Sequence, residues 1–117
     1  MITRFSWENA YNWDTNEYNG PLCGGSCHIR KHKKYLGSFF ISVIFPNDQY
    51  SKNVYQEFYI DDNDKYIFLF EPFSSNQNIK IEKLLKDIIK EIKYRFKLEH
   101  FFIYLFDRED NKTVYEF

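Results

Sequence analysis

The chain has 117 residues, with 16 basic and 17 acidic side chains and a formal net charge of −1 at pH 7. We expect one domain over residues 1–117, because two smaller cores would each be marginal. The balanced charge excludes the strong global field that collects nucleic acid or anionic lipid. The sequence shows neither an apolar run of about 20 residues nor a signal peptide pattern, so we expect a cytoplasmic protein without a membrane partner.

The first 20 residues mix aromatic side chains with Asn, Asp and Glu in no clean period, which predicts an ordered arm or a short first strand. Asn19-Gly20-Pro21 is expected to break the chain, and Cys23 to His32 to form a Gly-rich turn. Strand signals begin near Tyr35 and end at Pro46. Their alternation places one set of side chains on one face, Phe39, Ile41, Val43 and Phe45, and another on the opposite face, Phe40, Ser42 and Ile44.

Two further strands are predicted in the middle of the chain, Val54 to Ile60 and Lys65 to Glu71. The polar link of residues 61–64 between them favours an antiparallel hairpin. Pro72 then ends this part of the sheet, because proline cannot donate to a strand ladder.

From Ile79 the apolar period changes to 3.6, which predicts a helix that continues to Phe96. The apolar stripe of this helix contains Ile81, Leu84, Leu85, Ile88, Ile89, Ile92 and Phe96. Strands are expected at Glu99 to Phe106 and at Thr113 to Phe117. The order of elements predicts an α+β fold, with a mostly antiparallel sheet of about five to six strands and one long amphipathic helix packed on one face. Several strands are apolar on both faces, so the second face needs a cover, by the N-terminal arm, a second copy or a partner.

Four potential zinc ligands lie within ten residues, at Cys23, Cys27, His28 and His32. A tetrahedral site normally separates two ligand pairs by a longer connection, whereas Cys27 and His28 are adjacent. In an extended segment His28 and His32 would lie about 13 Å apart, too far to share one ion. We therefore predict free thiols, no metal and no cofactor; zinc and a reversible Cys23–Cys27 disulfide are the alternatives.

No phosphate-binding loop, dinucleotide fingerprint or catalytic elbow is present, so the sequence predicts a protein that is not an enzyme. The basic run Arg30 to Lys34, with the helix lysines and exposed tyrosines, favours a nucleic-acid-binding regulator as the alternative function. The acidic clusters at residues 61–64 and 107–110 lie in predicted loops. They indicate either turn chemistry or a surface that meets a basic nuclease.

Four segments carry a resemblance to known proteins: Trp13-Asp14, the strand Leu36 to Pro46, the strand Tyr66 to Phe70, and the helix Ile81 to Phe96. They resemble segments of bacterial immunity proteins, in particular the immunity protein 8 family. The resemblance covers residues 13–96, and residues 98–117 depart from it. It implies a protein that neutralises a cognate protein toxin by direct binding; a phage-encoded inhibitor of a host defence enzyme fits the same description.

The partner-binding residues are predicted in and after the strand Val54 to Ile60, where exposed aromatic side chains would supply hot spots and acidic side chains would steer the partner. They are Tyr55, Glu57, Tyr59, Asp61, Asp62 and Asp64. Spare aromatic surface is also compatible with a homodimer.

Overall fold

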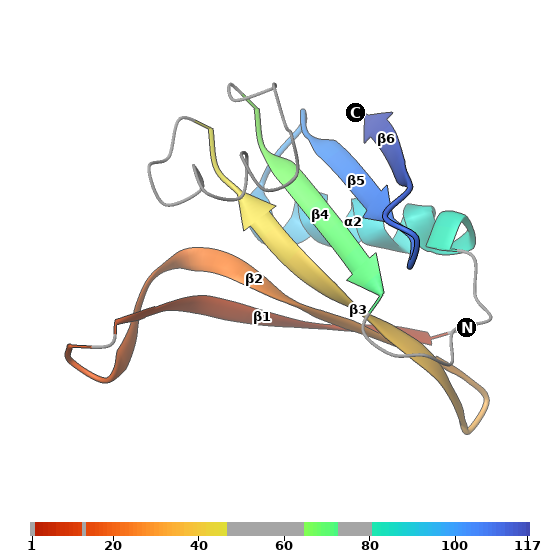
Figure 1. Cartoon of the computed structure of the whole chain (residues 1–117), viewed down its shortest axis with the longest axis horizontal. Coiled ribbons are helices and arrows are strands. Elements are labelled where there is room, and N and C mark those ends of the chain that lie inside the picture. The colour runs from red at the N-terminus through yellow and green to blue at the C-terminus, as the bar shows by residue number, and fades with distance from the viewer. Residues whose placement is uncertain (1, 13, 47–64, 73–80) are drawn as a thin grey trace.

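The structure, a computed structural model, describes residues 2–12, 14–46, 65–72 and 81–117 (Figure 1). Its elements are β1 (Ile2–Asn12), β2 (Glu17–Lys31), β3 (Lys34–Ile44), β4 (Ile67–Pro72), the 3-10 helix η2 (Ile81–Leu84), α2 (Leu85–Phe96), β5 (Phe102–Phe106) and β6 (Lys112–Glu116). These strands form one sheet in chain order. Neighbours are antiparallel except β4 and β5, which are parallel and lie on either side of α2 in the chain. The predicted α+β fold is confirmed.

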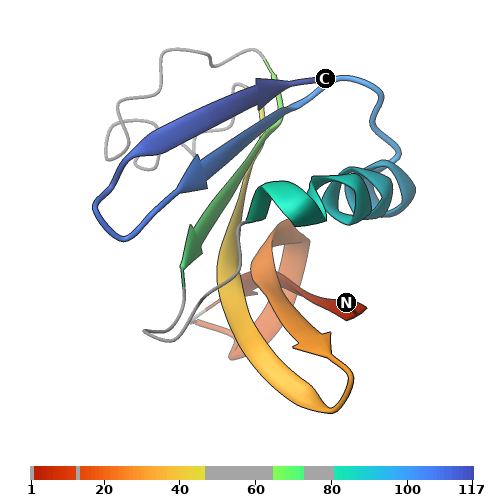
Figure 2. The same cartoon turned by 90° about the vertical axis from the view of Figure 1, so that its right-hand side faces the viewer.

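The side of the sheet covered by α2 holds the larger core cluster (Figure 2). The alternation predicted for β3 is confirmed, because Phe39, Ile41 and Val43 all belong to this cluster. The helical stripe is confirmed as well, since Ile88 and Ile92 are fully buried there. Burying a side chain of this size stabilises the fold by ~1.5–3 kcal/mol, so α2 is held by packing more than by its own propensity.

A smaller core cluster lies on the opposite face, over β4, β5 and the end of β3. It contains Ile44, Ile67, Leu69, Phe102 and Tyr104. These side chains are buried within a single chain, so this half of the second face needs neither a second copy nor a partner to cover it. The N-terminal residues do not lie across that face: β1 is a strand at the border of the sheet, and Phe5 and Trp7 pack against the cluster on the α2 side.

The predictions for residues 19–32 are wrong, because β2 runs without interruption from Glu17 to Lys31. Asn19-Gly20-Pro21 does not end the strand. It falls in an irregularity of the β1–β2 ladder, where the register passes directly from Asn9↔Leu22 to Tyr11↔Tyr18. A proline is tolerated at such a bulge because no ladder hydrogen bond needs its nitrogen.

Gly24 and Gly25 likewise mark close packing of strands and not a turn. A Cβ atom on Gly25 would lie 2.1 Å from the carbonyl oxygen of Ser6, and one on Gly24 would lie 2.7 Å from that of Ile41. The turns lie elsewhere, where Asn16 and His32 adopt positive φ values of 62° and 55°.

The strand predicted at Lys65 to Glu71 is confirmed as β4, whereas the strand predicted at Val54 to Ile60 falls outside the described residues. The last two predicted strands are confirmed as β5 and β6. In the described ranges, no helix is long and apolar enough to cross a membrane.

Candidate binding surface

The partner-binding residues predicted from the sequence lie in a part of the chain that the structure does not describe. They are Tyr55, Glu57, Tyr59, Asp61, Asp62 and Asp64. Their role stays a prediction, and the surface below is built from other residues.

The basic run predicted from the sequence forms the tip of the β2–β3 hairpin, which we call the basic tip (residues 30–34). All five of its residues are exposed. The ladder between β3 and β4 begins at the pair Phe39↔Pro72, so β2 and β3 continue past the end of β4 (Figure 1). The hairpin therefore carries four permanent positive charges, those of Arg30, Lys31, Lys33 and Lys34, beyond the body of the sheet.

Two aromatic side chains, Tyr35 next to the basic tip and Phe40 further along β3, are exposed on the side of β1–β3 that faces away from α2. We call this side the open face. Tyr35 is 43% exposed and Phe40 is 49% exposed. The cross-strand pairs Arg30↔Tyr35 and Ser26↔Phe40 place a polar side chain beside each ring. In the part of the sheet formed by β1–β3, the face toward α2 is buried, whereas the open face presents aromatic and polar side chains together.

Tyr35 is held in place by its neighbours on the open face. The guanidinium carbon of Arg30 lies 5.4 Å from the centre of the Tyr35 ring, a cation–π contact, and the His28 ring centre lies 6.3 Å away. The register shifts between Ile29 and Arg30, which turns Tyr35 to the open face while Leu36 packs into the core. Gly37, with φ 153°, supplies the backbone conformation for this shift, since that value is rarely adopted by other residues.

Sequence reasoning identified only part of this surface. The alternation of β3 predicted that Phe40 faces away from the core cluster, but it did not find Tyr35, whose side depends on the shift in register. The available signal was Gly37, because a glycine inside a strand often marks a bulge.

Ser26 and His28 also lie on the open face, where Ser26 Oγ is 3.2 Å from His28 Nε2. A nucleophile and a base need this distance, but the base also needs a third group that orients it. Among the described residues, no carboxylate is hydrogen-bonded to His28. The pair is suited to hydrogen bonding with a partner.

The two cysteines occupy different environments on β2. Cys27 is buried on the α2 side, where burial and the carboxylates of Asp87 and Glu91 raise the pKa of its thiol to about 12. Cys23 is exposed, and partial burial of its sulfur raises its pKa as well. Neither thiol is a reactive thiolate at neutral pH. Cys27 and His28 point to opposite faces of the strand, and the described residues hold no group of three potential metal ligands.

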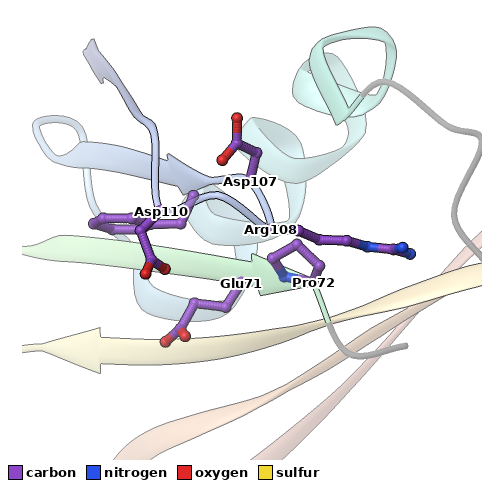
Figure 3. Close-up of a pocket in the computed structure, with 6 residues that line it drawn as sticks. Glu71, Pro72, Asp107, Arg108 and Asp110 are labelled. Atoms are coloured by element: carbon purple, nitrogen blue, oxygen red, sulfur yellow. The ribbon is translucent and has the colours of Figure 1, made fainter. Parts of the chain in front are cut away.

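A shallow pocket of about 240 Å³ lies at the carboxyl ends of β4 and β5 (Figure 3). It is lined by Glu71, Pro72, Phe106, Asp107, Arg108 and Asp110. The acidic loop predicted at 107–110 is thus confirmed as the loop between β5 and β6. Asp107 stabilises this loop, because its carboxylate accepts hydrogen bonds from the backbone N–H groups of Glu109 and Asn111. The hydrogen bonds from the backbone N–H and the side-chain amide of Asn111, with that from Glu109, hold the pKa of Asp107 below its usual value.

The helix lysines do not extend the open face. Lys86, Lys90 and Lys93 are exposed on α2, and α2 covers the other side of the sheet. The predicted combination of these lysines with the basic tip on one surface is therefore wrong; Tyr55 and Tyr59, the tyrosines of that prediction, lie outside the described residues.

No family model matches the chain, and no curated protein or solved structure matches it. The resemblance to immunity proteins stays an expectation from the sequence.

Proposed function

We propose that the protein is a non-enzymatic binding protein that neutralises a cognate protein toxin by docking on it through the open face. The observation that carries this proposal is the exposure of Tyr35 and Phe40 on a strand whose other face is buried in the core. Aromatic side chains supply much of the affinity of protein interfaces, because they bury a large area at a low cost in side-chain entropy.

The charge of the hairpin supports a partner with an acidic surface. Arg30, Lys31, Lys33 and Lys34 lie within five residues, and Arg4 is exposed on the same side of the sheet. Such a cluster accelerates association with an acidic protein and rejects a basic one. The association rate is therefore expected to fall as salt rises, while the dissociation rate depends on the two aromatic anchors.

The test is co-purification with the protein encoded beside this one in the genome, followed by calorimetric titration. We expect Tyr35→Ala and Phe40→Ala each to weaken binding about 30-fold, the effect of losing a ~2 kcal/mol hot spot. Tyr94→Ala is the matched control, because Tyr94 is 72% exposed on α2 and away from the open face. Unchanged affinity in both open-face variants would show that the toxin does not bind there.

Nucleic-acid binding is the second candidate, and the neighbourhood of Tyr35 favours it. An exposed ring beside four cations can stack a base while the cations contact phosphates. A fluorescent oligothymidine separates the candidates, because nucleic-acid binding weakens steeply with salt through counterion release. Binding that is lost in both Tyr35→Ala and Lys31→Glu would favour this function over toxin neutralisation.

A further inference from the structure

β1 lies at the border of the sheet. Of the described strands, only β2 pairs with it (Figure 1). The ladder is continuous from Ile2 to Glu8, and the extra residues at both irregularities belong to β2. β1 therefore has an uninterrupted outer edge over residues 2–9. Such an edge exposes backbone donors and acceptors that can pair with another strand.

The side chains of this edge are complementary to themselves. When β1 is set antiparallel to a second copy with Ser6 opposite Ser6, Arg4 lies opposite Glu8 and Phe5 lies opposite Trp7. Because the two copies are related by a two-fold axis at Ser6, the dimer contains each of these two contacts twice. Arg4, Ser6 and Glu8 share the open face, whereas Phe5 and Trp7 share the α2 side, so charge meets charge on one face and ring meets ring on the other.

We propose that the protein forms a homodimer by antiparallel pairing of β1 with β1 of a second copy, centred on Ser6. The aromatic side is prepared for this contact. Trp7 is fixed by a 3.0 Å hydrogen bond from its Nε1 to Glu91 Oε1 and by an edge-on contact with Phe96, with ring centres 5.0 Å apart. Phe5 stacks on Trp7 at 6.0 Å. Both rings remain half-buried in one copy, so pairing would cover the aromatic surface that is still exposed.

The charges select this register over its neighbours. A centre on Arg4 would place Arg4 opposite its own copy, and a centre on Glu8 would do the same for Glu8; like charges directly opposite one another destabilise a strand pair. A centre on Phe5 places Arg4 opposite Ser6 and Glu8 opposite Ile2, and a centre on Trp7 places Glu8 opposite Ser6, so in neither register do opposite charges lie directly across from each other. Centring on Ser6 pairs both charges at once.

The dimer has a consequence for the open face. A two-fold axis perpendicular to the plane of the sheet relates the two copies, and it keeps both open faces on the same side of one continuous sheet. Each dimer would therefore present two basic tips and two pairs of exposed aromatic side chains on one side. The dimer does not depend on the identity of the partner, because it uses the edge of β1 and not Tyr35 or Phe40.

Charge reversal tests the register. Sedimentation velocity over a wide range of concentration should show a reversible dimer. Arg4→Glu and Glu8→Arg should each raise its dissociation constant at least about tenfold, since each places like charges at two symmetric positions. The double variant exchanges the charges and should restore association to within about threefold. Arg95→Glu, the same charge change on exposed α2, is the matched control and should leave the dissociation constant unchanged.

Disulfide cross-linking tests whether Ser6 is the centre of the paired strands. The variants also carry Cys23→Ser, which removes the exposed native thiol. Residues directly opposite in an antiparallel pair have Cα atoms ~4.5–5.5 Å apart, which a disulfide can bridge. Ser6→Cys should therefore form a covalent dimer on oxidation, whereas Thr3→Cys should not, because Thr3 faces Asn9. A chain that stays monomeric at every concentration, or a dimer in which the charge exchange restores nothing and Ser6→Cys does not cross-link, would overturn the proposal.

Discussion

Gly25→Ala tests the close approach of β1 and β2 on which the border strand depends. The added Cβ would lie 2.1 Å from the carbonyl oxygen of Ser6 and 3.1 Å from the Cα atom of Trp7. Both neighbours are backbone atoms, so no side-chain rotation can relieve the contact. The two strands would have to separate by about an ångström, the kind of displacement that overpacking forces on a core.

The expected cost has two parts. Overpacking of this kind costs ~1–3 kcal/mol. Separating the strands also weakens the adjacent ladder hydrogen bonds, each worth ~1 kcal/mol net. We therefore expect a loss of about 3 kcal/mol in the free energy of unfolding, and a fall in melting temperature of roughly 10 °C at this chain length.

The measurement is urea and thermal unfolding followed by circular dichroism. Ser26→Ala is the control, because Ser26 is the next residue on β2 and its side chain lies on the open face, where its hydroxyl forms a hydrogen bond with His28. We expect this control to change stability by less than about 1 kcal/mol. If Gly25→Ala unfolds within about 0.5 kcal/mol of the wild type, β1 and β2 do not approach as closely as the structure has them.

Three further predictions concern other parts of the chain. Cys23 should react with a thiol reagent in the folded protein, faster as pH rises, whereas Cys27, with a pKa of about 12, should react only on unfolding; equal rates would contradict their environments. Asp107→Ala should lower stability at pH 7. Because the pKa of Asp107 is depressed by folding, this difference should shrink as pH falls below its ordinary value of 3.8, which urea unfolding at pH 7 and pH 3 would show. The prediction from the sequence places the interface at residues 55–64 instead of the open face, where acidic side chains would favour a basic partner. If it holds, replacing these residues together should weaken toxin binding in calorimetry, whereas unchanged affinity would show that they lie outside the interface. The positions to replace are Tyr55, Tyr59, Asp61, Asp62 and Asp64.

The period of apolar residues predicted β3 and α2, because in each element the buried side chains recur at a constant spacing. β3 alternates between the core cluster on the α2 side and the opposite face, and the stripe of α2 recurs at the helical period, so both could be identified from local sequence. The parallel pairing of β4 with β5 was not predicted. The strand–helix–strand order contained the signal, since a connection through a helix is the usual way to bring two strands parallel.

β2 was missed because its composition reflects contacts with other strands and not its own backbone preference. Gly24 and Gly25 indicate a turn when only the local sequence is considered. In the folded chain they are required where the carbonyl groups of Ser6 and Ile41 come close. Pro21 indicates a break for the same reason, yet it lies within the β1–β2 irregularity. Tertiary packing decided the conformation of this strand, and no window of local residues contains that information.

The distribution of burial divides the sheet into two halves with different roles. β4 and β5 have buried side chains on both faces, with Phe68 and Leu69 on opposite sides and both fully buried. β1, β2 and most of β3 are covered by the core on one side only, whereas the end of β3 at Ile44 is buried on the second side as well. Partner binding is therefore best placed on the open face, and self-association at the edge of β1.

The two associations can be separated experimentally, because Glu8→Arg reverses a charge on the proposed dimer edge while Tyr35→Ala removes a ring that lies two strands away. If each variant impaired only its own association, the two surfaces would be independent; a loss of partner binding in Glu8→Arg would instead show that the partner needs both open faces of the dimer.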